Sequence, residues 1–222
     1  MSKPTLGYWD LRGIAEPIRM LLHYADVDFE DKRYVYGDAP DFDKSDWLNV
    51  KHKLDIPFPN LPYFIDGNVK LSQSWAILKY VARKYKVFLP DEKEQHLCDI
   101  MEGVVTDFRQ VVLTMWYSED FVQLAEQFFK DLPAMLDDLE AHFRKYEWAG
   151  GSTLTYVDFA VGEWLNQVEL MKSTCFDNHP ADKTYLKKFS NLDKVVSHRS
   201  SPSFNKFPIT SKKARWGNQF ER

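Results

Sequence analysis

The hydrophobic pattern of the chain changes near residue 85, and this change limits the folds available to it. Before that point, short apolar runs are bounded by Gly, Pro and Asp, and they alternate with brief stretches of helical spacing. Beyond it, apolar residues recur at helical spacing over much longer stretches. We therefore predict a small α/β domain at residues 1–84, a linker at 85–91 that contains Leu89-Pro90-Asp91, and an all-helical domain at 92–222.

The first 84 residues predict the order strand, helix, strand, followed by two strands and a helix. The last two strands flank Asp66-Gly67, a pair typical of a hairpin turn. This order builds a small mixed sheet with helices packed on it. The expected elements are strands at 5–9, 29–36, 61–65 and 69–71, a helix after Gly13 and a helix from Ser74.

Beyond the linker we expect long helices at 97–115 and 121–143, and Pro133 is expected to bend the second. A third helix should begin at Thr155, because Thr155 and Asp158 have the spacing of a capping box. The first long helix also carries a narrow polar seam beside its apolar stripe. Such a seam either faces water or forms the wall of a cleft, and the spacing alone favours water. The seam comprises Gly103, Thr106, Asp107, Gln110, Thr114 and Tyr117.

Several classes of function are excluded by the composition. The formal net charge of -4 gives no basic surface for nucleic acid. Cys98 and Cys175 lie far apart, which argues against a disulfide framework or a thiolate metal site. The six histidines form no i,i+4 pair, and neither a phosphate-binding glycine motif nor a nucleophile motif is present. No apolar run approaches the length of a membrane span and no leader pattern occurs at the start, so we expect a soluble, cytoplasmic protein.

The remaining chemistry-bearing residues gather in segments that resemble one protein family. The segments GYWDLRG, YGDAPDFDKSDWLN, FPNLPYFIDG, LSQSWAIL, TYVDF and ITSKKARWGN are similar in order and spacing to those of the mu-class cytosolic glutathione transferases. This resemblance spans nearly the whole chain. It implies a thioredoxin-like N-terminal domain, an all-helical C-terminal domain and a homodimer. It also implies glutathione as a co-substrate, a small-molecule electrophile as the second substrate, and no metal or cofactor.

The resemblance assigns Tyr8 to the sulfur of glutathione. A thiol with a pKa near 8.5 is mostly protonated at neutral pH, whereas the thiolate is the nucleophile. Lowering that pKa by about two units requires about 2.7 kcal/mol, and a hydrogen bond to a charged group contributes about 1.5 to 3 kcal/mol. One hydroxyl could therefore supply most of the effect. In an arbitrary protein, a strand tyrosine such as Tyr8 would more often be a packed core residue.

Further glutathione contacts follow from the resemblance. Asp107 would come from the partner subunit and bind the γ-glutamyl ammonium group, Pro62 would follow a cis peptide bond, and Phe58 would enter the partner's helical domain, although Phe58 could equally be a core residue. As plain alternatives, Ser74 could be an ordinary helix cap and the lysines ordinary surface charge. The residues expected to bind glutathione, besides Tyr8 and Asp107, are Trp9, Ile14, Lys44, Trp47, Lys51, Asn60, Leu61, Pro62, Gln73 and Ser74.

The resemblance places the electrophile against Leu11, Thr106, Gln110, Tyr117, Thr210 and Ser211. Because Thr106, Gln110 and Thr210 replace more apolar residues, we expect a pocket more polar than usual. Tyr117 is a candidate catalytic hydroxyl that could stabilise a developing oxyanion, or it could simply pack at a helix end.

The chain departs from the family pattern at Lys44, Asp55, Pro57 and Trp75. Lys44 replaces an arginine, so a bidentate carboxylate contact becomes a point charge. Asp55 and Pro57 alter the loop that carries Phe58. The sequence predicts conjugation of glutathione to small hydrophobic electrophiles in detoxification. A glutathione-dependent isomerase and a non-catalytic binder of hydrophobic ligands with the same fold are the alternatives.

Overall fold

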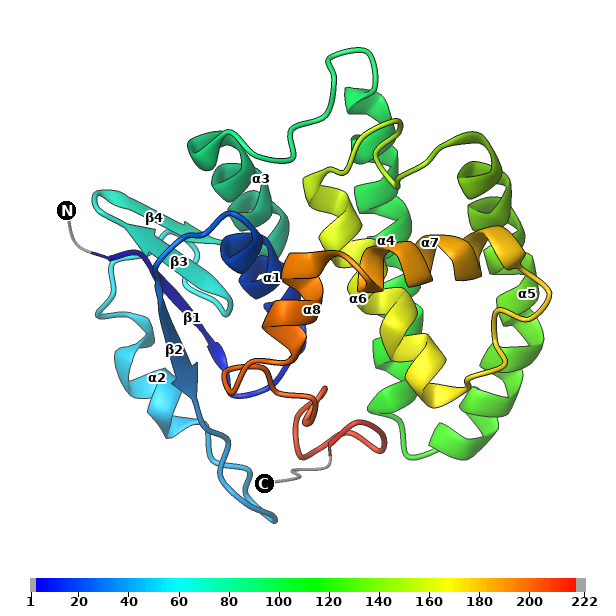
Figure 1. Ribbon diagram of the computed structural model, residues 1–222. Helices are drawn as coiled ribbons and strands as arrows, with labels where there is room; N and C mark the ends of the chain where they lie inside the picture. Colours follow the sequence, from blue (N-terminus) through cyan, green and yellow to red (C-terminus); the bar gives the residue numbers. More distant parts are fainter. Residues whose placement is uncertain (1–2, 219–222) are drawn as a thin grey trace. The chain divides into compact units, whose positions relative to one another are not determined.

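The computed structural model describes residues 3–218, which divide into two compact units (Figure 1). The first unit holds the residues up to Tyr85 together with those from His198 onward, and the second holds Lys86–Ser197. The division after Tyr85 falls at the change in hydrophobic pattern. The residues after Ser197, however, were expected among the helices and group instead with the first unit. The N–H groups of Arg12 and Gly13 donate to the carbonyls of Pro208 and Ile209, which fastens this segment there.

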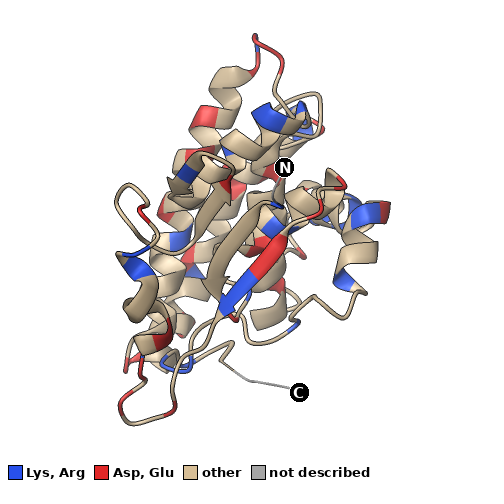
Figure 2. Ribbon diagram, turned by 90° about the vertical axis from the view of Figure 1, so that its left-hand side faces the viewer, with Lys and Arg blue, Asp and Glu red and all other residues tan. Residues whose placement is uncertain are grey.

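The first unit is built on a four-stranded mixed sheet. Its strands are β1 (Thr5–Trp9), β2 (Glu30–Tyr34), β3 (Tyr63–Asp66) and β4 (Val69–Ser72), in the order β2-β1-β3-β4. β1 is parallel to β2 and antiparallel to β3, and β3 is antiparallel to β4. Figure 2 shows the edge strand β2 with an acidic beginning and a basic end. Charges on an edge strand oppose pairing with other chains.

Helices cover both faces of this sheet. The first unit contains α1 (Glu16–Tyr24), α2 (Ser45–Lys51) and α3 (Ser74–Tyr85), and α1 packs against α3. Side chains alternate between the faces of a strand, so the fully buried Leu6 lies on the face opposite to Gly7. Gly7 makes room for the ring of Tyr63, since a Cβ there would lie 2.1 Å from that ring. Tyr63 stacks on Trp47 of α2 with ring centroids 5.8 Å apart, which fixes α2 on that face.

The second unit is helical. It consists of α4 (Gln95–Trp116), α5 (Phe121–Lys145), α6 (Tyr156–Met171) and α7 (Pro180–Ser190), while α8 (Asp193–Arg199) spans the division between the units. α6 lies at the centre, because it packs against both α4 and α7 and most of its residues are buried. α5 packs against α4 and α7, and it continues through Pro133. No helix within residues 3–218 is both long and apolar enough to cross a membrane.

The structure agrees with the sequence where the local pattern is strong. The strand at Thr5–Trp9 and the helix beginning at Ser74 have the predicted limits. The capping box of Thr155 and Asp158 is confirmed, since the carboxylate accepts the Thr155 N–H at 2.8 Å. Three short helices, α2, α7 and α8, were not predicted.

Candidate active site

Tyr8 stands at the end of β1, with 8% of its surface exposed. The loop after β1 folds back over its ring, and the N–H of Ile14 donates to the Tyr8 Oη at 3.4 Å. This approach depends on Gly13, whose φ is +45° and where a Cβ would lie 2.6 Å from Oη. A tyrosine hydroxyl that accepts such a bond can still donate its own proton to an anion. The arrangement is therefore suited to holding a thiolate.

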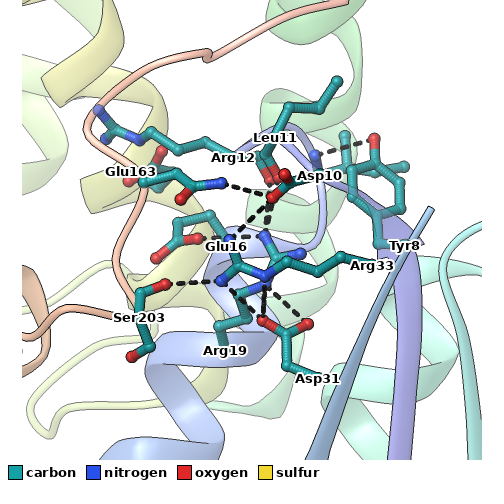
Figure 3. A network of polar contacts seen from close by, with 12 residues as sticks. Tyr8, Asp10, Leu11, Arg12, Glu16, Arg19, Asp31, Arg33, Glu163 and Ser203 are labelled. Carbon is teal, nitrogen blue, oxygen red and sulfur yellow. Dashed lines mark hydrogen bonds and ion pairs between the residues drawn. The ribbon is translucent and has the colours of Figure 1, made fainter. Parts of the chain in front are cut away.

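A network of buried charges lies beside this loop (Figure 3). Arg19 of α1 donates through Nε to Asp31 at 3.0 Å and through Nη1 to the carbonyl of Leu11 at 2.9 Å. Glu16 lies 3.3 Å from the Arg19 Nη1 and 2.6 Å from the His198 Nε2. Burial alone would raise the pKa of Glu16, but the hydrogen bond with His198 and the charge of Arg19 outweigh it and lower that pKa. Glu16 is therefore a carboxylate inside the protein.

The segment after α8 holds the same loop from another side. Besides the two backbone bonds from Arg12 and Gly13, Asn205 Nδ2 donates to Asp10 Oδ1 at 2.9 Å. The N–H groups of Arg12 and Gly13 therefore already have acceptors, and Glu16 in the first turn of α1 partly offsets the positive end of that helix.

One hydrophobic cluster brings together several of the residues predicted to bind glutathione. It includes Tyr8, Trp47 and Leu61, together with Leu11 of the predicted electrophile pocket, and Trp9 and Ile14 pack against it. Trp47 is 4% exposed and contacts Tyr34 edge-on, with ring centroids 5.3 Å apart. The predicted lysines lie at the two ends of α2: Lys44 is exposed at the N-cap, and Lys51 is half-buried at the last residue.

The Leu61–Pro62 peptide bond is cis. The N–H of Leu61 already has a hydrogen-bond acceptor within the chain. Asn60 Oδ1 accepts the N–H of Leu61 at 2.9 Å. A peptide that bonds to the Leu61 N–H would therefore have to displace the Asn60 side chain. Gln73 is exposed with φ at +74°, and Ser74 begins α3, so the first amides of that helix follow directly.

The predicted residues of the second unit lie along α4. Asp107, Thr106 and Gln110 are exposed, and Tyr117 at the end of the helix is 45% exposed. The Thr106 hydroxyl donates to the Glu102 carbonyl of its own helix at 2.7 Å. All six members of the polar seam are exposed.

Thr210 and Ser211 belong to the first unit and are each 4% exposed. The Thr210 hydroxyl donates to the Trp216 carbonyl at 2.6 Å. Two of the three residues expected to make the pocket more polar, Thr106 and Thr210, therefore direct their hydroxyl protons to the backbone.

Phe58 is 87% exposed, so it is not a core residue of the described chain. It lies in a loop where Asp55 and Phe58 both have positive φ, and Lys70 pairs with Asp55 at 3.1 Å.

The second unit contains an apolar cavity of about 420 Å³ between α4, α5 and α6. Its lining includes Ile100, Val104, Val111, Met135, Leu139 and Asp107.

The thiols of the chain itself are poor nucleophiles. Burial raises the pKa of Cys98 to about 11 and that of Cys175 to about 12, so both stay protonated at neutral pH. Within the described residues, no three His, Cys, Asp or Glu side chains are grouped to hold a metal ion. A thiolate nucleophile would have to come from a bound ligand.

Sequence reasoning missed Arg19, Glu16 and His198. Glu16 and Arg19 lie three residues apart on α1, on the side away from the apolar stripe of Ile18, Leu21 and Leu22, yet both are 1% exposed. Charges opposite an apolar stripe are typical of a solvated helix face, so the spacing gave no signal for a buried network. His198 gave no signal either, since it lies 182 residues from its partner.

Two family models match the chain. The glutathione S-transferase N-terminal domain matches residues 4–83, and the glutathione S-transferase C-terminal domain matches residues 106–202. The chain is 43% identical over 218 residues to proteins named glutathione S-transferase Mu 3 from Macaca fuscata fuscata and Homo sapiens, covering 98% of this chain and 97% of each relative.

A solved structure shows the same fold over nearly the whole length. The crystal structure of the glutathione S-transferase Blo t 8 superposes with a TM-score of 0.87 at 33% identity, covering 96% of this chain and 99% of that one. Both units, the thioredoxin-like sheet and the helices, are thus shared with known transferases. The chain therefore belongs to the glutathione S-transferases, and within them to the mu class.

Proposed function

We propose that this chain conjugates glutathione to small, moderately hydrophobic electrophiles, and that the Tyr8 hydroxyl stabilises the glutathione thiolate. The observation that carries the proposal is the position of Tyr8 near the end of β1, where the N–H of Ile14 donates a hydrogen bond to the Tyr8 Oη. The O–H donates to the sulfur anion and need not ionise itself. No observation favours an isomerase or a non-catalytic binder, and the free thiols of Cys98 and Cys175 are compatible with a cytoplasmic protein.

The peptide part of glutathione is assigned to residues around the same cluster. Trp47, Lys44 and Lys51 at the two ends of α2 would bind the glycyl carboxylate, while Gln73 and Ser74 at the start of α3 would bind the γ-glutamyl carboxylate. The backbone of Leu61, before the cis bond to Pro62, would pair with the cysteinyl part after Asn60 releases its N–H. Glutathione is a co-substrate, and no metal or redox cofactor takes part.

The ultraviolet absorbance of bound thiolate tests the role of Tyr8. Titration of the native chain saturated with glutathione should give a near-neutral apparent pKa, and Tyr8→Phe should raise it by about two units. Tyr80→Phe is the matched control, because it removes a hydroxyl that donates to Asp66 in the same unit. Loss of saturable glutathione binding in the native chain, or an unchanged pKa in Tyr8→Phe, would contradict the proposal.

We further propose a homodimer in which Phe58 of each subunit enters the apolar cavity of its partner. The support is that Phe58 is exposed while Ile100, Val104 and Val111 present an apolar wall to solvent. Burying a phenylalanine contributes about 1.5 to 3 kcal/mol, and a two-fold dimer makes the contact twice. Asp107 of the partner subunit also lines the cavity wall and is the carboxylate assigned to the γ-glutamyl ammonium group.

Sedimentation at low concentration tests this dimer. Phe58→Ser should raise the dissociation constant more than about 100-fold, given about 3 to 6 kcal/mol for two contacts. Val35→Ser is the control, because Val35 is also an exposed apolar residue of the first unit, at 56%. An equal shift in both variants, or a monomeric native chain, would overturn the proposal.

For the electrophile, the candidate donor is Tyr117, which is partly exposed at the end of α4. A phenol can stabilise the oxyanion that develops when an epoxide opens. Comparing Tyr117→Phe on an epoxide and on a chloroaromatic substrate tests this role. A loss confined to the epoxide supports it, whereas equal rates on both substrates in the variant and the native chain count against it.

A further inference from the structure

Arg19 contacts both the Tyr8 ring and the loop that follows β1, two parts of the candidate site whose relative position must stay fixed. Its Nη1 donates to the carbonyl of Leu11 at 2.9 Å, in the loop that follows β1. Its Cζ lies 5.9 Å from the centroid of the Tyr8 ring, which is within the range of a cation–π contact. One buried side chain, 1% exposed, thus touches both the loop and the tyrosine that the loop covers (Figure 3).

The guanidinium is fixed on its other side by two carboxylates. Nε lies 3.0 and 3.2 Å from the two oxygens of Asp31, and Nη1 lies 3.3 Å from Glu16. Glu16 is itself held by His198 at 2.6 Å. Burial alone would lower the pKa of Arg19, but the charges of Asp31 and Glu16 raise it. The cation therefore stays charged and keeps one orientation.

The remaining guanidinium nitrogen of Arg19, Nη2, is consistent with the same orientation. Nη2 is buried and has no hydrogen-bond acceptor in the described part of the chain. A buried donor without an acceptor is costly unless another attraction compensates for it. The face of the nearby Tyr8 ring offers that attraction to the cation.

We infer that Arg19 is a positioning residue of the thiolate site, which keeps the Tyr8 hydroxyl aimed by fixing the Leu11 carbonyl and supporting the Tyr8 ring. This inference rests on the proposed function. Arg19 acts through Tyr8 and does not touch the substrate. The reason that such a residue matters is geometric, because a displacement of about 1 Å in a catalytic group costs about 100-fold in rate.

Arg19→Lys separates positioning from simple charge balance. Lysine keeps the positive charge between Asp31 and Glu16, but it lacks the planar fork that reaches a carboxylate and a carbonyl at once. We expect the bound thiolate to have its pKa raised by about one unit, and kcat/KM at pH 6.5 to fall about tenfold. At pH 9 the activity should recover, because glutathione ionises there without help. Binding of S-methylglutathione, which has no thiol, should stay within about twofold, since a pKa effect alone leaves the peptide contacts intact.

Arg33→Lys is the matched control. Arg33 also binds Asp31, at 2.8 Å, and its other hydrogen bonds go to Asp10 and to the Ser203 carbonyl, not to the Leu11 carbonyl. The pKa of bound glutathione should not change in this variant. An equal rise of the glutathione pKa in both variants would show that any disturbance of Asp31 has this effect, and it would overturn the inference. A drop in S-methylglutathione binding that accounts for the whole activity loss would overturn it as well.

Two further measurements keep the test decisive. If Arg19→Lys does not fold, Asp31→Asn removes the anchor of Nε at a residue whose side chain is 19% exposed. The same direction of pKa change is expected, and an unchanged pKa would reject the inference.

Tyr8→Phe is titrated in parallel. No effect of Tyr8→Phe means that the proposed function fails, whereas an effect there without one in Arg19→Lys means that only the role of Arg19 fails.

Discussion

Each unit buries an acidic side chain, Glu16 in the first and Asp182 in the second, and the two have opposite surroundings. In the first unit, the buried Arg19 has carboxylates on two sides and Glu16 has a cation and an imidazole. In the second unit, Asp182 of α7 is completely buried, and neither of its oxygens has a hydrogen-bond partner in the described chain. Its neighbours are acidic, because Glu140 and Asp137 act on it from α5.

The same burial therefore has opposite electrostatic results. Attractive partners lower the pKa of Glu16 in spite of its burial. Burial, followed by repulsion from Glu140 and Asp137, raises the pKa of Asp182 to about 8. At neutral pH Glu16 is ionised and Asp182 is mostly protonated.

These two buried acids consequently lose their contributions to stability at opposite ends of the pH range. Glu16 releases its proton on folding, so its contribution is present at neutral pH and disappears as the pH falls below its unfolded value of 4.5. Asp182 takes up a proton on folding, so its contribution is present below pH 3.8 and is lost as the pH rises through about 8. The network beside Tyr8 is therefore electrostatically satisfied at working pH, whereas the acid in α7 is a cost there.

The largest effect is expected for Arg19→Met. It leaves Asp31 and Glu16 without their shared cation, and breaking a buried ion pair costs about 3–5 kcal/mol. The midpoint of urea unfolding should fall at an unchanged slope.

A double variant provides the control for Arg19→Met. Adding Glu16→Gln removes one of the uncompensated charges, so it should recover part of the lost stability. A loss below about 1 kcal/mol in Arg19→Met, or a further loss in the double variant, would show that the network is not held by charge as described.

Asp182→Asn should change stability in the other direction. Replacing an unpartnered buried acid with a neutral side chain of the same shape should stabilise the chain by about 2 kcal/mol at pH 8.5, which corresponds to about 4 to 8 °C in Tm. Near pH 4.5 the gain should almost vanish, because native Asp182 is already protonated there.

Asp177→Asn is the matched control for this pH dependence. Asp177 precedes the same helix, but its side chain is 52% exposed and pairs with Lys183 in solvent. Its effect on Tm should stay near about 1 °C at both pH values. An equal gain at pH 4.5 and 8.5 in Asp182→Asn would contradict a protonated buried acid.

The elements that were predictable from the sequence are those set by neighbours along the chain. The strand at Thr5–Trp9, the start of α3 at Ser74 and the capping box at Thr155 depend on alternation or on side chains three residues apart. Such patterns are visible in any window of a few residues. The short helices α2 and α7 were missed, because their polar sequences give no strong periodic signal and tertiary contacts, such as the stacking of Trp47 on Tyr63, hold them.

The candidate site was predictable as a list of residues but not as a geometry. The family resemblance pointed to Tyr8, yet the bonds that fix its loop come from Pro208 and Ile209 at the other end of the chain. The bond between Asn60 and the Leu61 N–H is local, but nothing in the residue types distinguishes it from a solvent contact. Long-range pairs such as Glu16 and His198 arise only when the chain folds.

The smallest effect is expected for Lys84→Met, which tests whether solvent exposure or charge pairing decides how much stability is lost. Lys84 pairs with Asp66 in the first unit, but its side chain is 38% exposed. Solvent screens such a pair, so its loss should cost at most about 1 kcal/mol, and the difference should shrink further at high salt. Asp66 also keeps the hydroxyl of Tyr80 at 3.1 Å. Urea unfolding at low and high salt measures both quantities. If Lys84→Met cost as much as Arg19→Met, then charge pairing in this unit would matter regardless of burial, and burial would not be what distinguishes Arg19.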